Sequence, residues 1–233
     1  MAAVGKIVHI ARYPVKSMRG EELESTKVGF QGIAGDRMHA FVQEGDQTSF
    51  PWLTAREYQG ILGYQPSWRE VEGKPGLFAG RADGAFPIDS VELREQLERE
   101  SGLKLRLHSD HRGNHDIAYV SVITTATIAR LAAEAGVPAD HRRFRMNIIV
   151  ESDLPPFAER EWVGQAVRIG GCELAVTEQD RRCVMITFDP ETGATSPSVL
   201  KSAGQLNGAC AGVYASVAAA GMVSVGDSVV VGG

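Results

Sequence analysis

The segment that decides the fold is residues 181–193, which read RRCVMITFDPETG. Its last five residues, 189–193, are typical of a tight turn, because Pro190 pre-sets the backbone φ and Gly193 accepts the positive φ that closes the turn. The short apolar run before them, residues 184–188, predicts a strand that leads into this turn as one arm of a hairpin.

The rest of the chain has the same character. Most apolar residues lie in short runs broken by Gly, Pro and Asp, which is typical of strands and turns. The other predicted strands are residues 6–13, 38–43, 103–108, 147–151, 167–169, 173–177 and 229–231. The expected fold class is therefore mainly β with a few helices (α+β).

Three segments predict helices: residues 54–62, 89–100 and 125–135. Thr54 and Glu57 have the spacing of a capping box, and Asp89 gives the second helix a similar start. Gly102 and Gly136 follow the second and third helices, where a residue of positive φ commonly ends a helix.

Length and composition bound the domain organisation and the partners. The chain has 233 residues, of which 43% are hydrophobic, enough for one large β-rich domain or two smaller ones packed together. The polar stretch 109–114 is the best boundary, which divides the chain into residues 1–113 and 114–233. The formal net charge of -5 argues against attraction to nucleic acid or to an anionic membrane, so we expect neither as a partner.

The three cysteines, Cys172, Cys183 and Cys210, are widely spaced and form no C-x-x-C motif. A cysteine zinc site, a local iron–sulfur cluster and a secreted disulfide framework are therefore not expected. Residues 1–9 lack the apolar run of a signal peptide, and no stretch has the length of a membrane span. We expect a cytoplasmic protein.

Arginine is concentrated in short segments of this acidic chain. Residues 141–145 contain three guanidinium groups, and Arg181 and Arg182 directly precede Cys183. Lys16 and Arg37 lie in turn-like segments. Guanidinium groups recognise phosphate through paired, charge-assisted hydrogen bonds, so these residues are candidates for an anion site. The alternative, that they are solvated or salt-bridged surface charges, stays open at this point.

Cys183 is the candidate reactive cysteine. Adjacent cationic side chains favour the thiolate, which ligates soft metals or attacks electrophiles. The alternative is a buried, inert thiol. Cys172 and Cys210 have no cationic neighbours in the sequence and are expected to be structural.

Other chemistry has little support. His108, His111 and His115 could converge on a metal only along a helix, which Gly113 and Asn114 oppose. No G-x-S-x-G, P-loop or dinucleotide-binding motif is present.

Several of these segments, taken in order, resemble the MOSC family, including its N-terminal β-barrel subdomain. They are residues 13–17 (YPVKS), 35–37 (GDR), 53–56 (LTAR), 143–148 (RFRMNI), 182–183 (RC), 189–193 (DPETG) and 225–229 (VGDSV). The resemblance implies a MOSC-type β-barrel, an N-terminal β-barrel subdomain and a cleft between them that holds the molybdenum cofactor.

The resemblance also implies the site residues. The implied cofactor-binding residues are Lys16, Ser17, Arg37, Asp116, Arg145, Asn147, Arg181, Arg182, Cys183 and Tyr214, with Cys183 as the metal ligand and the catalytic residue. Lys16 and the arginines would neutralise the phosphate of the cofactor. Cys183 would complete the sulfur ligands of a thiophilic metal, and Asn147 would hydrogen-bond the polar edge of the pterin.

The chain departs from the family pattern at three places. Met146 stands where a proline is common, and residues 179–181 read Gln-Asp-Arg where a second cysteine often lies. Ala211 stands where an aromatic residue often precedes the glycine before Tyr214. These differences bear on substrate identity more than on cofactor binding.

The implied activity is an oxidoreductase that reduces N-hydroxylated small molecules. The sequence contains no ferredoxin-like cysteine set, so such a reductase needs an external electron-transfer protein, an iron–sulfur or haem donor with its reductase. The alternative is a non-redox role as a cofactor carrier or sulfur-transfer protein, served by a cysteine desulfurase. A binding module without chemistry is a third class, and the resemblance alone does not choose among them.

Overall fold

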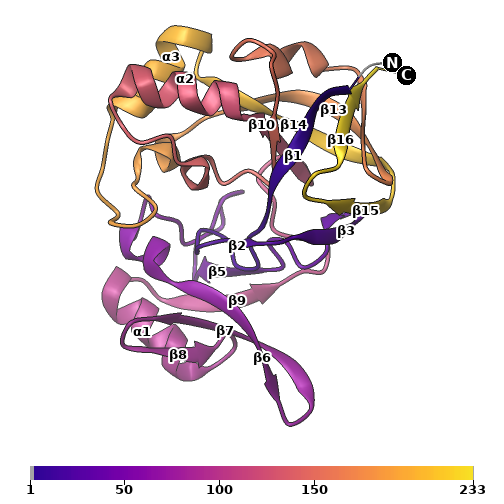
Figure 1. Ribbon diagram of the computed structural model, residues 1–233. Helices are drawn as coiled ribbons and strands as arrows, with labels where there is room; N and C mark the ends of the chain where they lie inside the picture. Colours follow the sequence, from indigo (N-terminus) through magenta and orange to yellow (C-terminus); the bar gives the residue numbers. More distant parts are fainter. Residues whose placement is uncertain (1–2, 233) are drawn as a thin grey trace.

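The structure is a computed structural model that describes residues 3–232. Within these residues strands predominate, with three α-helices, so the predicted fold class is confirmed (Figure 1). No helix of this part of the chain is long and apolar enough to cross a membrane.

Seven strands of the described chain close into a barrel. In order around the barrel they are β1 (Ala3–Arg12), β11 (Ile148–Glu151), β10 (Val120–Thr124), β14 (Cys210–Ala219), β13 (Cys172–Arg181), β12 (Ala166–Ile169) and β16 (Ser228–Val231). Strand β1 closes the circle, because it pairs with β11 at Ile7↔Val150 and with β16 at Gly5↔Val229. Among these seven strands of the described chain, only β10 and β11 pair in parallel. Closure removes the free edges that an open sheet would expose.

The barrel is filled by β-branched side chains from alternate positions of its strands. Ile10, Val122, Val150 and Val213 are each at most 1% exposed and belong to one core cluster. Full burial of one such side chain contributes about 1.5–3 kcal/mol, so this core is a large part of what holds the barrel together.

Two helices pack against each other on the outside of the barrel, at the top of Figure 1: α2 (Thr125–Ala135) and α3 (Ser198–Asn207). The predicted helix 125–135 is confirmed. The Thr124 side chain caps its start, and Gly136 ends it with a φ of 68°. Ile128 of α2 and Val199 of α3 share a core cluster on this side.

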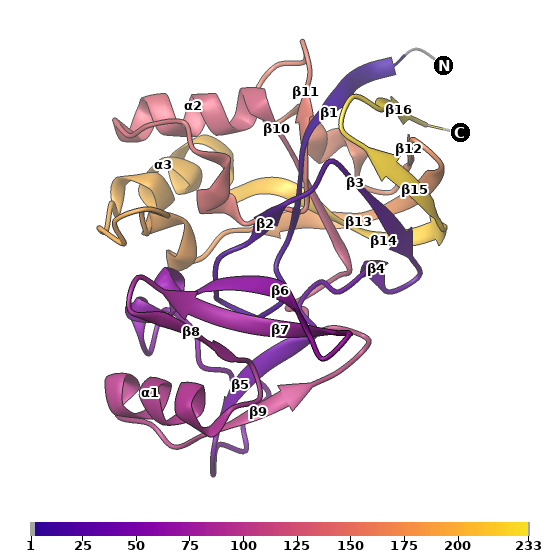
Figure 2. The same cartoon turned by 60° about the horizontal axis from the view of Figure 1, so that its bottom comes forward.

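A second β-rich body lies below the barrel in Figure 2. Its elements are β5 (His39–Gln43) paired with β9 (Leu105–Ser109), the sheet β6 (Gln65–Val71), β7 (Lys74–Arg81) and β8 (Gly84–Pro87), and helix α1 (Val91–Ser101). Phe41, Leu93 and Leu97 are at most 1% exposed in its core. Helix α1 confirms the predicted second helix, with Ser90 as its N-cap and Gly102 at its end.

A small sheet joins residues from both ends of the chain. Strand β3 (Ser25–Gly29) pairs with β4 (Gly32–Ile33) on one side and with β15 (Gly221–Ser224) on the other. The division at residue 113 stays a prediction. Strand β1 comes from the first part but completes the barrel that the second part otherwise forms.

The strand predicted over residues 184–188 is wrong. Residues Val184–Thr187 form a 3₁₀ helix, η4, in which Ile186 N donates to the carbonyl of Cys183 at 3.3 Å. The turn brings Ile186 into the core beneath α2 and α3, where it is fully buried. Packing of this side chain therefore overrides the strand preference of the run.

The turn predicted over residues 189–193 is confirmed. Gly193 has a φ of 73° and its N–H donates to the Asp189 carbonyl at 2.8 Å. The arms of the expected hairpin reduce to one bridge between Phe188 and Thr195.

The helix predicted over residues 54–62 is also wrong in extent. Half of the capping box forms: the Glu57 carboxylate accepts from the Thr54 N–H at 2.8 Å, but the Thr54 hydroxyl accepts from the Arg56 N–H at 3.2 Å. Tyr58 then takes an extended backbone, with φ -144° and ψ 98°, and only a 3₁₀ helix, η1 (Gln59–Gly63), follows. Gly60 and Gly63 weaken further helix propagation.

Candidate functional site

A cleft of about 260 Å³ lies between the barrel and the second body. Its walls include all ten residues expected from the sequence: Lys16, Ser17, Arg37, Asp116, Arg145, Asn147, Arg181, Arg182, Cys183 and Tyr214. They come from residues 16–214, so the fold gathers into one cavity side chains that the sequence spreads over most of the chain.

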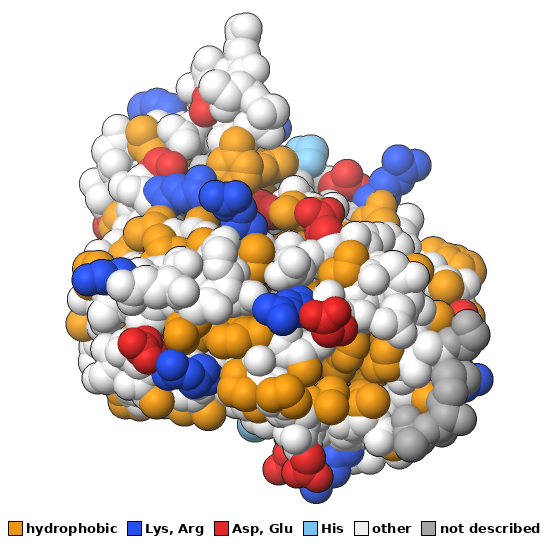
Figure 3. Space-filling model, turned by 90° about the horizontal axis from the view of Figure 1, so that it is seen from above, with side chains coloured by type: hydrophobic (Ala, Val, Ile, Leu, Met, Phe, Trp, Pro, Cys, Tyr) orange, Lys and Arg blue, Asp and Glu red, His pale blue; other side chains and the backbone are white. Residues whose placement is uncertain are grey.

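The cleft is strongly cationic. Five arginines and one lysine line it against two aspartates, although the whole chain has a net charge of -5. His115 adds no charge at neutral pH, because burial and then the nearby Arg37 lower its pKa to about 4. The outer face in Figure 3 differs, since its basic and acidic side chains are interspersed among apolar ones. The cations are therefore concentrated where a ligand would lie.

Lys16 lies in the wall of the cleft and is only 7% exposed. Its ammonium donates to the Asn114 carbonyl at 2.8 Å and to the Asp116 carboxylate at 2.5 Å. Burial lowers the pKa of Lys16, and Asp116 opposes that shift. The Asp116 side chain is 54% exposed, so it holds the buried ammonium at the solvent side of the cleft.

Asn147 is the centre of a buried hydrogen-bond network. Its Oδ1 accepts from the N–H and the hydroxyl of Ser121, at 3.2 and 3.0 Å. Its Nδ2 donates to the Ala11 carbonyl at 3.1 Å and to the Asp36 carboxylate at 3.0 Å. These four bonds use the full capacity of the amide. The expectation that Asn147 reads the pterin is therefore corrected, because this side chain supports the wall of the cleft and has no donor left for a ligand.

Asp36 extends this network to Arg37. The Asp36 carboxylate accepts from the Tyr13 N–H at 2.7 Å and pairs with the Arg37 guanidinium. The other arm of Arg37 donates to the Arg145 carbonyl at 3.0 Å. Asp36 belongs to the 35–37 motif but was not predicted as a site residue. Its carboxylate holds the side chains of Arg37 and Asn147 in place, and such a supporting role is not visible in the sequence.

Among the cleft cations of residues 3–232 that are not exposed, Arg145 is the one without a partner; Arg56 and Arg181 also lack one, but both are exposed. Within residues 3–232, the Arg145 guanidinium makes no hydrogen bond or ion pair, and it lies over the Tyr13 ring at 4.5 Å from the centroid. Burial lowers the pKa of Arg145 to about 10, so the group is still charged at neutral pH. A partly buried cation without an anion is costly, which makes Arg145 the strongest candidate for an anion ligand.

The other arginines of residues 141–145 have partners outside the cleft. Arg142 pairs with Asp140 at 2.6 Å on the surface. Arg143 is 4% exposed and pairs with Asp189 of the 189–193 turn at 2.7 Å. Arg142 and Arg143 are therefore salt-bridged charges, which is the alternative that the sequence left open. Of the three arginines, only Arg145 lines the cleft.

The two arginines before Cys183 have different roles. Arg181 is exposed at the rim of the cleft. Arg182 is buried, pairs with Asp180 and donates to the Phe144 carbonyl at 2.5 Å. Asp180 therefore balances the charge of Arg182, and the role of Arg182 in cofactor binding stays a prediction. The Arg182 Nε is buried without a partner in the described chain.

Cys183 lies two residues after Arg181, the last residue of β13, and directly precedes η4. Its backbone is extended (φ -118°), and the preceding N–H of Arg182 donates to the Ala209 carbonyl at 2.8 Å. The thiol is half-buried and lines the cleft, from a backbone that is anchored on both sides. Cys172 is buried in the barrel core, and Cys210 is half-buried. Neither of these two lines the cleft.

Tyr214 and Ser17 complete the wall. Tyr214, on β14, is half-buried, and burial raises the pKa of its phenol, with Asp180 acting in the same direction. Tyr214 is therefore a neutral donor at the cleft. Ser17 is only 7% exposed.

Backbone strain is concentrated at this site. Among residues 3–232, six non-glycine residues have a positive φ, and Ser17 (66°), Arg37 (48°) and Arg145 (53°) are three of them. Such conformations are unfavourable for residues with a Cβ and persist only where the surroundings enforce them. The backbone is therefore held in an unfavourable conformation at three residues that line the cleft.

A second cavity of about 200 Å³ adjoins the cleft. The two share Arg145 and Met185 in their linings. Tyr13, whose ring lies beneath the Arg37 and Arg145 guanidinium groups, lines the second cavity. Arg145 is therefore placed to contact a ligand in either space.

Two family models match the sequence of this chain. A family model described as "MOSC domain" matches residues 108–230, and a second, "MOSC N-terminal beta barrel domain", matches residues 4–65. The chain belongs to the MOSC family. The resemblance seen in the ordered motifs is thereby confirmed, and the cleft lies between the two parts that the family models match.

Relatives of this MOSC protein support the same assignment. Over 112 residues it is 32% identical to a molybdenum cofactor sulfurase of Caenorhabditis elegans; the match covers 46% of this chain and 15% of that much longer protein. The crystal structure of the YUAD protein from Bacillus subtilis aligns over 97% of this chain and 94% of its own, with a TM-score of 0.54 and 13% identity. At that identity the alignment shows a shared fold.

Proposed function

We propose that this MOSC protein binds the molybdenum cofactor in the cleft and reduces N-hydroxylated small molecules with electrons from an external donor. The observation that carries the proposal is Arg145, a partly buried guanidinium that has no anion partner among residues 3–232 and opens into a cleft shared with Lys16 and Cys183. A ligand that carries both an anion and a soft metal fits this set of donors.

The anion would be held by Arg145 and Lys16. Arg145 has all its donors available, and Lys16 has used two of its three N–H groups. Arg37 is committed to Asp36 and to the Arg145 carbonyl, so it fixes the position of Arg145. Charge-assisted contacts of this kind favour a phosphate over a neutral ligand.

The metal would be held by Cys183. A thiolate is a preferred ligand of thiophilic metals, and this thiol lines the same cleft as Arg145. Its backbone is fixed by the end of β13 and by η4. When bound, the cofactor supplies the redox chemistry that removes oxygen from a substrate. The chain itself would hold the cofactor and orient the substrate beside Tyr214.

The rigid position of Cys183 favours the reductase. A cysteine that carries sulfur between two proteins must reach each of them in turn. Cys183 is instead half-buried between anchored elements, a position suited to a permanent ligand. The sequence contains no cysteine set for an iron–sulfur cluster, so the electron donor would be a separate iron–sulfur or haem protein with its reductase.

A sulfur-transfer role is the second candidate. It is favoured by the similarity to a molybdenum cofactor sulfurase, although the match covers 15% of that protein. In this role the bound cofactor would be carried or modified with sulfur supplied by a cysteine desulfurase, and Cys183 would hold it during the transfer.

The proposal is tested by the contents and turnover of protein purified from a host that makes the cofactor. We expect about one molybdenum and one releasable pterin per chain. We also expect reduction of a hydroxylamine or amidoxime with an artificial one-electron donor and none with NADH alone. Protein without molybdenum or pterin would contradict cofactor binding. Fully loaded protein that is inactive with every donor would favour the sulfur-transfer role.

Arg145→Ala should weaken cofactor retention at least tenfold. Charge-assisted hydrogen bonds contribute roughly 1.5–3 kcal/mol, and about 1.4 kcal/mol corresponds to a factor of ten in affinity. The pterin remaining after dialysis is the measurement. Arg130→Ala is the control, because Arg130 pairs with Glu134 on α2 and lines neither cavity. Equal retention by the two variants would show that Arg145 does not hold the anion.

A further inference from the structure

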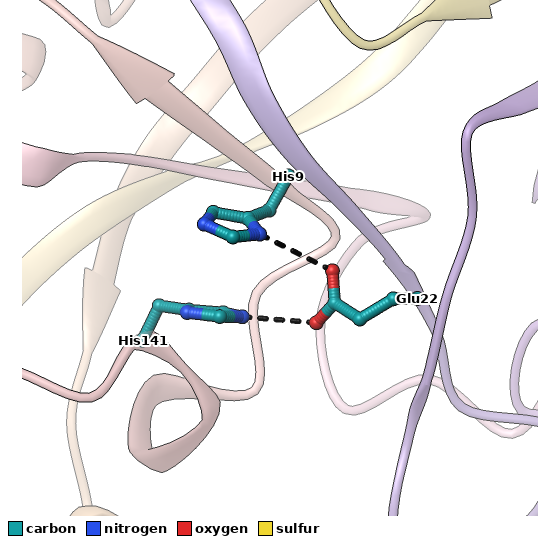
Figure 4. Close-up of side chains that lie close together, drawn as sticks. All are labelled: His9, Glu22 and His141. Carbon is teal, nitrogen blue, oxygen red and sulfur yellow. Dashed lines mark hydrogen bonds and ion pairs between the residues drawn. The ribbon is translucent and has the colours of Figure 1, made fainter.

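Three side chains that can ligate a metal converge outside the cleft (Figure 4): His9, Glu22 and His141. His9 Nδ1 lies 3.4 Å from one Glu22 carboxylate oxygen, and His141 Nε2 lies 2.9 Å from the other. The three ligand atoms lie within 4.8 Å of one another. Among residues 3–232, no other group of three or more His, Cys, Asp or Glu side chains meets this condition. None of the three lines the cleft.

The backbone brings these residues together from distant parts of the chain. His9 is on β1, and Glu22 is on β2 (Glu21–Glu22), which pairs with β1 at Ala11↔Glu22. His141 begins the 3₁₀ helix η2 (His141–Phe144), which is capped by the Asp140 side chain. Each ligand therefore lies on a hydrogen-bonded element.

The imidazole rings are already oriented for a shared ligand. The rings of His9 and His141 stack with centroids 4.1 Å apart and an interplanar angle of 20°. In this arrangement one nitrogen of each ring points to the same carboxylate, as Figure 4 shows. A metal ion could replace these two contacts, because each neutral ring can carry its proton on its other nitrogen.

We propose that His9, Glu22 and His141 form a binding site for a divalent transition-metal ion of the Zn²⁺ type. Two imidazoles and one carboxylate are a common ligand set for Zn²⁺, which takes a fourth ligand, such as water, in tetrahedral geometry. The side chains are 43%, 50% and 21% exposed in that order, so an ion can reach them from solvent.

The ion would connect the barrel to the segment that carries Arg145. It would link β1 and β2 to η2, and η2 ends at Arg145 as its C-cap. Glu22 also lines the second cavity, which Arg145 lines as well. The site is thus distinct from the proposed molybdenum ligand, Cys183, but close to the proposed anion ligand.

Titration calorimetry with Zn²⁺, on full-length protein treated with a chelator, tests the site. We expect one ion per chain at this site, with affinity at least tenfold lower in His9→Ala and in His141→Ala. Substitution of a residue that only hydrogen-bonds to a metal ligand already lowers metal affinity roughly 10- to 100-fold. Glu22→Gln keeps the shape of the side chain and should weaken binding as well. His111→Ala is the control, since His111 is exposed and outside the group. Thermal melts without metal report whether each variant is folded.

Co²⁺ identifies the ligands. We expect the visible bands of four-coordinate Co²⁺ without an intense sulfur-to-metal band. These bands should persist in Cys183→Ser and be lost in the His9→Ala, His141→Ala double variant. Failure of the parent protein to bind Zn²⁺ at millimolar concentration would overturn the proposal. So would binding that the folded double variant retains unchanged, or a Co²⁺ spectrum dominated by sulfur.

Discussion

Cys183→Ser should reduce turnover by the cofactor-loaded protein to background while the chain remains folded. A serine oxygen is harder than a thiolate and loses its proton less readily, so a thiophilic metal should hold it poorly. The half-buried side chain is replaced by one of similar shape, and the contacts of Arg145 and Lys16 do not involve it. The cofactor should therefore be partly retained with a changed metal environment.

X-ray absorption gives the decisive count of sulfur ligands at the metal, beside the rate with an artificial donor. Cys210→Ser is the matched control, because Cys210 is also half-buried but lies outside the lining of the cleft. An unchanged number of sulfur ligands in Cys183→Ser would show that Cys183 does not ligate the metal.

Asn147→Ala should destabilise the cofactor-free protein by about 3–5 kcal/mol, since each buried polar group left without a partner costs roughly 1–3 kcal/mol. The substitution leaves Ser121, the Ala11 carbonyl and Asp36 without their bonds to the amide. Urea unfolding measures the change in the free energy of unfolding.

Asn207→Ala is the control for this substitution. Asn207 is half-buried, donates to the Cys210 carbonyl at 3.0 Å and accepts from the exposed Arg160 guanidinium at 3.4 Å, so its loss should cost about 1 kcal/mol. If Asn147→Ala were no more destabilising than Asn207→Ala yet lost the cofactor, Asn147 would be a ligand contact, as the motif alone suggested.

The residues that line the candidate site could be predicted from the sequence, but the separate role of each residue could not. The family resemblance implied ten residues in one cleft, and all ten line it. Residues 141–145 show the limit. Their three arginines look alike in sequence, and they differ only because η2 ends in a left-handed residue at Arg145 and Asp189 lies beside Arg143. Such a backbone conformation on a residue with a Cβ has no signature in a single sequence.

The same limit applies to the fold. The strands expected from β-branched runs, such as residues 6–13 and 147–151, overlap β1 and β11. Strand β14 was not predicted, because Cys210–Ala219 is rich in Ala, Gly and Ser, which have weak strand preference. It is a strand because it lies between β10 and β13 in the closed barrel. Helix α3 was missed for a similar reason: it lacks a capping side chain at its start.

The way β1 closes the barrel bears on how the protein is made. Ala3 pairs with Val230, and Ile10 pairs with Ile148. Strand β1 therefore cannot form these pairings until β11 and β16 have been synthesised. Contacts between such distant residues form slowly, because the entropy of closing a long loop is lost before they stabilise the chain. Strand β1 also leads directly into Tyr13 and Lys16. The walls of the cleft are thus completed late in folding, and a ligand meets a finished binding site only after β11 and β16, the partners of β1, have been synthesised.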